Sequence, residues 1–265
     1  MTKKSTFQVE EINNQIVDWL KSYAENAKVN GFVIGISGGV DSAVTSTLCA
    51  QTGLQVLCVE MPIHQASSHI AQGREHITQL KKRFPNVNSV EANLTSLFDT
   101  FITSVPKDID VAKVNLALAN TRARLRMTTL YYFAGVYGLL VAGTGNKVED
   151  FGVGFYTKYG DGGVDLSPIA DLMKSEVFLL GQFLGVPKSI LTAAPTDGLF
   201  GDDRTDEDQL GASYDELEWA MLQEEMKKTA DDFTDRERIV FEIFKRLNGA
   251  NKHKMEPIPV FQIKK

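Results

Sequence analysis

The stretch that decides the fold reads Val33-Ile34-Gly35-Ile36-Ser37-Gly38-Gly39-Val40-Asp41-Ser42. Its apolar start predicts a buried strand, its two adjacent glycines a tight turn, and the residues after them the start of a helix. Gly38 and Gly39 let backbone N–H groups approach an anion closely, and a helix N-terminus adds partial positive charge. The stretch therefore predicts a pyrophosphate site at the end of a strand.

Asp41 lies in the middle of this anion cradle, where naked phosphate would repel its carboxylate. A divalent cation, most naturally Mg²⁺, removes that repulsion by bridging the carboxylate to a polyphosphate. The simpler alternative is a Gly-Gly turn before an amphipathic helix, with Asp41 and Ser42 as caps. A Walker loop is excluded, because Val40 and Asp41 follow the last glycine where that loop needs Lys and Ser or Thr.

The composition is that of an ordinary globular protein, with 265 residues, 43% of them hydrophobic and 23% charged. No apolar run approaches the roughly 18 residues of a membrane helix. Residues 1–5 lead into an amphipathic pattern in place of a secretory signal, so we expect a cytoplasmic protein that binds no membrane. The formal net charge of −6 argues against general nucleic-acid binding, which needs a basic face.

Neither the cysteines nor the histidines form a metal-binding pattern. The two cysteines, Cys49 and Cys58, make no CxxC pair and are expected to be buried. The four histidines are too scattered for a zinc site, and we expect His64, His69 and His76 on helix surfaces.

Strand and helix patterns alternate along the chain, which predicts an α/β fold: a doubly wound parallel sheet flanked by helices. Apolar periodicity from Val9 to Tyr23 predicts an N-terminal helix before the first strand. The expected strands are 32–36, 54–61, 87–90 and 139–142, and the expected helices are 41–52, 68–84, 96–105, 111–137, 175–184, 214–227 and 234–247. Residues 151–163 are expected to form a loop and 251–265 an extended tail. We interpret residues 1–265 as a single domain.

Two loops leave strands of this sheet at their carboxyl ends, where ligands of open α/β sheets bind. They are the glycine loop at 37–42 and the segment 143–149. We therefore expect both loops to face one ligand.

Several further motifs follow in fixed order along the chain. They are GTGNKVE at 143–149, FYTKYGDGGVD at 155–165 and LSPIADLMK at 166–174, supported by NTRARLRM at 120–127, PTD at 195–197, DEDQLGASY at 206–214, and His253-Lys254 followed by Pro257. The pattern S-G-G-x-D-S resembles the PP-loop of the ATP pyrophosphatase superfamily. Together the motifs resemble the NAD synthetases, from the first helix into the tail.

The resemblance implies an adenine nucleotide alpha hydrolase-like fold and a C–N bond-forming ligase. Such an enzyme amidates deamido-NAD (nicotinic acid adenine dinucleotide) to NAD⁺, using ATP and ammonia through an adenylated carboxylate, and releases AMP and pyrophosphate. Some relatives carry a glutaminase domain, for which this chain has no room, so we expect free ammonia as the nitrogen source. Related enzymes are homodimers, which implies a homodimer here.

The resemblance also assigns residues to roles. Asp41 and Glu149 would hold Mg²⁺, and Lys174 and Thr196 would act electrostatically in catalysis, with no covalent nucleophile. The residues implied for ATP are Gly35, Ile36, Ser37, Gly38, Gly39, Val40, Asp41, Ser42, Thr144, Lys174 and Thr196. Those implied for deamido-NAD are Arg124, Lys158, Asp165, His253 and Lys254.

Residues taken alone leave alternatives open. Arg122, Arg124 and Arg126 could form a solvated helix face, but residues two apart do not share one face, so we expect one of them to point inward and favour a functional role for Arg124. Some family members have an arginine where Glu60 stands, so the adenine contacts near Glu60 and Gln65 stay open. The acidic segment 195–211 is predicted to be a lid that closes over ATP, with an inert solvated loop as the alternative.

Two other functions compete with NAD synthesis. One is another PP-loop enzyme, either an amide-forming ligase or a tRNA-modifying adenylase. The acidity and the missing cysteine pairs count against the RNA-modifying version. The other is a non-catalytic nucleotide-binding module of the electron-transfer flavoprotein or stress-protein type, which would have little use for Asp41 together with Glu149.

Overall fold

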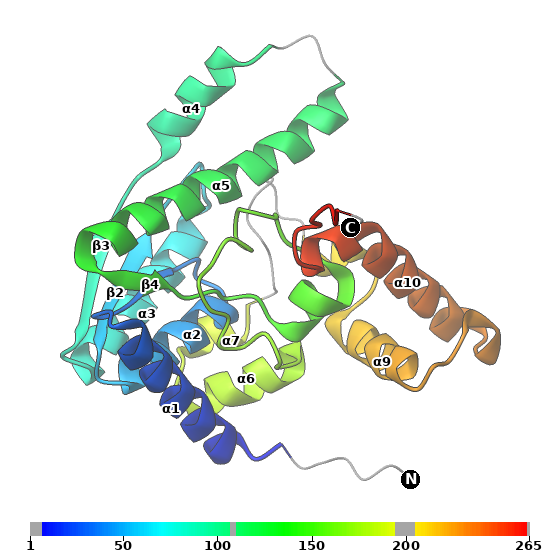
Figure 1. Ribbon diagram of the computed structural model, residues 1–265, viewed down its shortest axis with the longest axis horizontal. Helices are drawn as coiled ribbons and strands as arrows, with labels where there is room; N and C mark the ends of the chain where they lie inside the picture. Colours follow the sequence, from blue (N-terminus) through cyan, green and yellow to red (C-terminus); the bar gives the residue numbers. More distant parts are fainter. Residues whose placement is uncertain (1–6, 107–109, 194–204, 264–265) are drawn as a thin grey trace.

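The computed structural model describes residues 7–106, 110–193 and 205–263. Its centre is a parallel sheet with the strand order β3-β2-β1-β4. The strands are β1 (Gly31–Gly35), β2 (Gln55–Glu60), β3 (Val87–Glu91) and β4 (Leu139–Val141). The chain runs outward from β1 to β3 and then returns to place β4 on the other side of β1 (Figure 1). This reversal makes the sheet doubly wound, and the predicted fold class is confirmed.

Side chains of β1 alternate between two apolar layers, because successive strand residues point to opposite faces of a sheet. Phe32 and Ile34 pack into a core with α1 (Val9–Ala27), α2 (Val40–Gln51), α3 (Ser67–Arg83) and α6 (Lys174–Phe183). Val33 packs on the other face, with α4 (Thr95–Ser104) and α5 (Val111–Tyr137). Both faces of β1 are thus covered, and this explains why its sequence is an unbroken apolar run.

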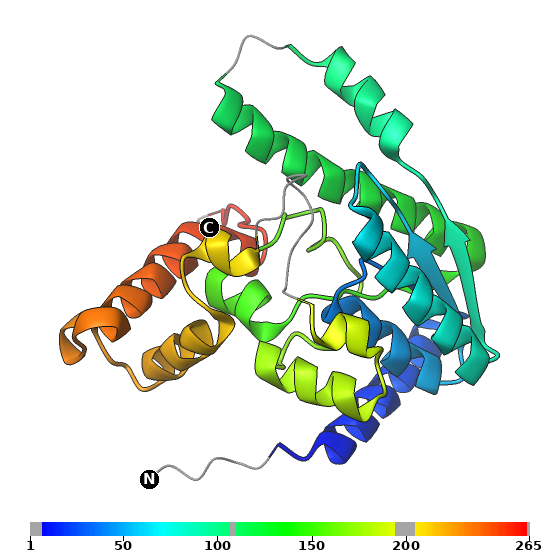
Figure 2. The same cartoon turned by 180° about the vertical axis from the view of Figure 1, so that it is seen from behind.

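A third core lies beside the sheet, in the C-terminal part of the chain (Figure 2). It joins η1 (Val148–Val153), a single π-helical stretch, to α9 (Tyr214–Glu225) and α10 (Asp235–Met255). The shorter helices α7 (Lys188–Leu191), α8 (Asp206–Leu210) and η2 (Ala230–Asp232) complete the elements of the described residues. None of the helices among these residues is long and apolar enough to cross a membrane.

The predicted tail was wrong for its first residues. Helix α10 continues to Met255, so residues 251–255 are helical and only 256–263 are extended. Asn248 and Asn251 explain the difference, because their side-chain amides donate to the carbonyls of Gly152 and Val153 and bind the helix to η1. Pro257 lies two residues after the last helical residue, Met255, and disfavours helical backbone in the residue before it.

Three other predictions need correction. His64 was expected on a helix surface, but it lies in a bend between β2 and α3, with a φ of +50°. The loop expected at 151–163 begins as π-helix, since η1 runs to Val153. His76 was expected on a helix surface, but it is buried on α3, with its Nε2 atom 2.8 Å from the hydroxyl of Ser46. The polar ring is tolerated there because the serine satisfies it, and burial lowers the pKa of His76 to about 4.

Candidate active site

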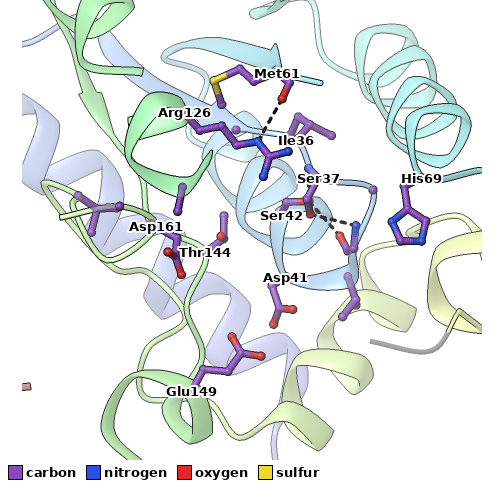
Figure 3. A pocket seen from close by; sticks show the side chains of 18 of the residues that line it. Ile36, Ser37, Asp41, Ser42, Met61, His69, Arg126, Thr144, Glu149 and Asp161 are labelled. Carbon is purple, nitrogen blue, oxygen red and sulfur yellow. Dashed lines mark hydrogen bonds between the residues drawn. The ribbon is translucent and has the colours of Figure 1, made fainter. Parts of the chain in front are cut away.

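A cavity opens at the carboxyl ends of β1 and β4, between the glycine loop and α5 (Figure 3). Both loops predicted to face one ligand reach it. Among the predicted ATP-binding residues, those that line the cavity are Gly35, Ile36, Ser37, Gly38, Gly39, Val40, Asp41, Ser42, Thr144 and Lys174. Thr196 and most of the predicted lid lie outside the described residues. The last part of that segment, residues 206–210, is the helix α8.

The glycine loop is shaped by its own serines. The hydroxyl of Ser42 accepts from the N–H of Ser37 and donates to the carbonyl of Gly39, and the hydroxyl of Ser37 accepts from the N–H of Gly39. Gly38 has a φ of +91°, and a side chain there would meet the backbone oxygen of His69 at 2.4 Å. Gly39 is the N-cap of α2, and no side chain caps that helix, so its first turn points bare N–H groups at the cavity.

Asp41 and Glu149 face each other across the cavity, as Figure 3 shows. The ammonium of Lys174 lies between them: its Nζ atom is 2.6 Å from Asp41 Oδ2 and 3.0 Å from Glu149 Oε1. Lys174 is only 3% exposed. Burial alone would lower its pKa, but the two carboxylates outweigh that effect and raise the pKa of Lys174 above its ordinary range. The two predicted metal ligands thus bracket one cation.

Two residues without a predicted role hold these carboxylates in place. The side-chain amide of Asn146 donates to Asp41 Oδ1 at 3.1 Å. The hydroxyl of Tyr214 donates to Glu149 Oε1 at 2.7 Å, and its ring centre is 4.7 Å from the Lys174 ammonium. Both residues stand inside quoted motifs, so their positions were visible in the sequence, but their pairing across the chain was not.

The donor set suits a hard divalent cation. Asp41 and Glu149 offer carboxylate oxygens, which Mg²⁺ prefers, and their spacing already accommodates one positive group. Within the described residues, no three His, Cys, Asp or Glu side chains gather into a metal-binding group. A metal held here would therefore complete its shell with substrate phosphates and water, as Mg²⁺ in nucleotide sites usually does.

Two further acids sit close to this pair. Burial, followed by the charge of Glu149, raises the pKa of Asp150 to about 7. Asp161 lines the cavity, and its burial raises its pKa to about 6. A side chain at Gly145 would stand 2.2 Å from Asp150 Oδ1, so this close approach requires glycine. The cavity wall around Glu149 is accordingly acidic.

The three arginines of α5 point in different directions. Arg126 lines the cavity and donates to the carbonyl of Met61 at 3.1 Å, next to Gln65, which also lines it. Arg122 covers the ring of Phe98, and Arg124 donates to the carbonyl of Lys158 at 3.3 Å. The face of α5 toward the cavity carries Ala123, Arg126, Met127 and Leu130. That helical spacing was the available signal for Arg126, to which no role was predicted.

The predicted deamido-NAD residues do not line the cavity, although Arg124 and Asp165 each follow a residue that does, Ala123 and Val164. Lys158 and Lys254 donate to backbone carbonyls, Lys158 to His253 at 2.5 Å and Lys254 to Gly154 and Tyr156 at 2.8 Å each. The structure thus brings Arg124, Lys158, His253 and Lys254 together at the end of α10. Asp165 lies apart from them and accepts from the hydroxyl of Tyr131 and the N–H of Val141.

Glu60 does not line the main cavity. Its carboxylate pairs with Arg74 at 3.3 Å, and Arg74 also pairs with Glu91 at 2.7 Å. Burial raises the pKa of Glu60, with Arg74 acting in the opposite direction. Gln65 is the nearer of the two to the glycine loop, because its amide donates to the carbonyl of Ser37 at 3.2 Å.

Comparison with known proteins places this site in a family. The NAD synthase family model matches residues 12–258. The ammonia-dependent NAD⁺ synthetase of Carboxydothermus hydrogenoformans is 36% identical over 233 residues, which cover 86% of this chain and 91% of that protein.

Two solved structures resemble the whole chain. The NMN synthetase of Francisella tularensis superposes with a TM-score of 0.83 at 31% identity, covering 97% of this chain and 100% of that one. The ammonia-dependent NAD synthetase of Campylobacter jejuni has a TM-score of 0.74 at 24% identity, over 96% and 100% of the two chains, and shows the same fold. The predicted C–N bond-forming ligase is thereby confirmed, and the chain belongs to the NAD synthase family.

Proposed function

We propose that this protein amidates deamido-NAD to NAD⁺ with ATP and free ammonia. One observation carries the proposal: the carboxylates of Asp41 and Glu149 bracket a cation beside a glycine loop that lines the same cavity. That is the arrangement needed to neutralise a pyrophosphate while an anionic carboxylate attacks. The ammonia-dependent relatives support free ammonia as the nitrogen source.

The chemistry needs positioning more than it needs a nucleophile. A nicotinate oxygen bonds to the α-phosphorus of ATP, the bond to pyrophosphate breaks, and ammonia then bonds to the carbonyl carbon as AMP leaves. In this scheme the glycine loop and the N-terminus of α2 bind the phosphates, and Lys174 follows the charge that develops on the leaving pyrophosphate. Asp41 and Glu149 would hold Mg²⁺, which supplies electrostatic stabilisation of the phosphates when bound.

Deamido-NAD is assigned to the residues predicted for it: Arg124, Lys158, Asp165, His253 and Lys254. The cationic side chains of Lys158 and Lys254 suit its phosphates or its nicotinate carboxylate. Both lysines donate to backbone carbonyls here, so the substrate must replace those carbonyls as the hydrogen-bond partner of each lysine. The acidic Asp161 at the cavity wall would favour ammonium over an anion at that side.

A homodimer is the proposed assembly, and the cytoplasm the proposed location. Helices α4 and α5 extend away from the body of the molecule (Figure 1). Large apolar side chains are exposed along them, namely Leu97, Phe101, Leu116, Tyr132, Val136 and Tyr137. Monomers rarely leave such surface uncovered, which supports an interface there. Light scattering on the pure protein would test it, since a monomer at micromolar concentration contradicts the proposal.

A second candidate function has its own support. The Francisella tularensis structure, which is called an NMN synthetase, shares 31% identity and a TM-score of 0.83 with this chain, against 24% and 0.74 for the Campylobacter jejuni NAD synthetase. An enzyme that makes NMN amidates a mononucleotide in place of a dinucleotide. The same ATP site would serve both reactions, so the difference lies in what the second site holds.

One assay tests both candidates. The pure protein is given ATP, Mg²⁺ and ammonium with either deamido-NAD or nicotinic acid mononucleotide, and AMP, pyrophosphate and the amide are measured. Amide from deamido-NAD at the higher kcat/KM supports the first candidate, and the reverse order supports the second. Amide from neither carboxylate contradicts both. Glutamine in ammonia-free buffer should be a poor nitrogen source, and equal activity with it would refute the use of free ammonia.

A further inference from the structure

The position of Lys174 has a consequence for the order in which ligands enter. Its ammonium contacts Asp41 Oδ2 and Glu149 Oε1, the oxygens that a metal between these residues would use. The other oxygen of Asp41 accepts from Asn146, and Glu149 Oε1 also accepts from Tyr214. The pair is therefore already neutralised in part and hydrogen-bonded without a metal.

Lys174 and a metal ion cannot share this gap. Two positive groups within about 3 Å of the same oxygens would repel each other strongly at the effective dielectric of a protein site. Lys174 is also enclosed, being 3% exposed and lying against the Tyr214 ring. It leaves only if it gains other partners, and the nearest large anion that could supply them is a polyphosphate in the glycine loop.

The start of α6 gives the side chain freedom to make that move. Lys174 is the first residue of α6, whose N-cap backbone is fixed by the carboxylate of Glu176 at 2.9 Å. Its backbone can stay in place while its four-carbon side chain swings between the carboxylates and the loop. Lys174 and the glycine loop line the same cavity.

We propose that the Lys174 ammonium occupies the Asp41–Glu149 site before nucleotide binds. It leaves the site when the metal that accompanies ATP enters. The proposal rests on the metal site of the proposed function and adds an order of binding to it. Without nucleotide, the protein binds a divalent ion weakly. With ATP, the phosphates hold both the lysine and the metal.

The test measures Mn²⁺ binding to nucleotide-free protein from the electron paramagnetic resonance signal of the free ion. Lys174→Met should bind Mn²⁺ at least about tenfold more tightly than the wild type, because a competing charge is gone. Adding Glu149→Gln should abolish that gain. Lys245→Met is the matched control, since it removes a lysine whose Nζ lies 2.7 Å from a surface carboxylate, that of Glu224, and its binding should equal that of the wild type.

Two results would overturn the proposal. One is a folded Lys174→Met protein, judged by circular dichroism, whose Mn²⁺ affinity equals that of the wild type. The other needs no lysine variant: tight Mn²⁺ binding by the nucleotide-free wild type that Glu149→Gln abolishes. NAD⁺ formation by the wild type is assayed in parallel and reports on the proposed reaction, whichever way the Mn²⁺ titration falls.

Discussion

The two ends of the site differ in how their charged side chains are used. At the nucleotide end, Asp41, Glu149 and Lys174 satisfy one another and open directly into the cavity. At the proposed second-substrate end, Lys158 and Lys254 donate to backbone carbonyls and hold a loop against α10. The nucleotide end is thus built from side chains that pair ionically with one another, and the other end from side chains that bind the backbone. Substitutions should therefore have different signatures at the two ends.

The largest effect is expected at the nucleotide end. Asp41→Asn keeps the size of the side chain but removes a carboxylate from the cation site, so turnover should fall on the order of 10²-fold or more. The measurement is kcat at saturating substrates over a range of Mg²⁺. Asp171→Asn is the control, because Asp171 is a surface carboxylate paired with Lys147 at 3.2 Å. Near-normal turnover of Asp41→Asn at low Mg²⁺ would remove Asp41 from the mechanism.

The second-substrate end should respond in KM. Lys254→Met loses two bonds to the carbonyls of Gly154 and Tyr156, which frees the loop that borders the cavity. We expect the KM for the nicotinate substrate to rise about tenfold, equivalent to the loss of about one hydrogen bond from a charged group, while the KM for ATP stays unchanged. Lys252→Met serves as the control, since its ammonium pairs only at the surface, with Glu256. An equal rise in both KM values would show that the two ends act as one unit.

Two arginines of α5 test whether the two ends of the site act separately, because each is expected to affect the KM of a different substrate. Arg126→Ala should raise the KM for ATP about fivefold, because this side chain lines the nucleotide cavity beside Gln65. Arg124→Ala should instead raise the KM for the nicotinate substrate by a similar factor, because its guanidinium contacts the carbonyl of Lys158. Steady-state kinetics with each substrate varied in turn distinguishes them. If the two variants gave the same pattern, α5 would not separate the two ends.

The smallest effect on activity, but a clear one on stability, is expected at His76. Its folded pKa of about 4 lies below the unfolded value near 6.5, so the unfolded state binds the proton first. Stability supported by the neutral ring is present above pH 6.5 and is lost as the pH falls toward 4.

Urea unfolding of the wild type and of His76→Gln at pH 7.5 and pH 4.5 measures this contribution. The wild type should lose about 2 kcal/mol more than the variant between these pH values. Activity at pH 7.5 should be similar, since the ring supports α2 through Ser46 and does not line the cavity. Equal losses in both proteins would mean that His76 does not control the acid sensitivity of this layer.

The sequence predicted the sheet and the nucleotide loop because both depend on local patterns. A strand buried on two faces, such as β1, is recognised from its continuous apolar run. The turn at Gly38 is recognised from its glycines. The parallel, doubly wound arrangement followed from general rules for alternating strands and helices, whereas the strand order came from the structure. Family motifs then added Glu149 and Lys174, which no local pattern connects.

The parts that sequence reasoning missed depend on contacts between distant segments. Tyr214 reaches Glu149 and Asn146 reaches Asp41 only after the sheet and the C-terminal core have formed. The length of α10 is set by amide bonds from Asn248 and Asn251 to η1, and a polar stretch gives no sign of such partners. The π-helical turn at 148–153 also follows from tertiary packing, since Val148 and Val153 are buried in the third core.

The pairing of β1 with β4 also determines when the site can form during folding. Gly31 pairs with Gln55 of β2 after a short crossover, but with Leu139 of β4 only after most of the intervening chain has been made. Contacts between such distant segments form slowly, because a large loop must close before they contribute stability. The cavity lies at the β1–β4 seam and takes Lys174 from still further along the chain. Any capacity to bind nucleotide therefore arises only after the chain well beyond β1, β2 and β3 has been synthesised and packed against them.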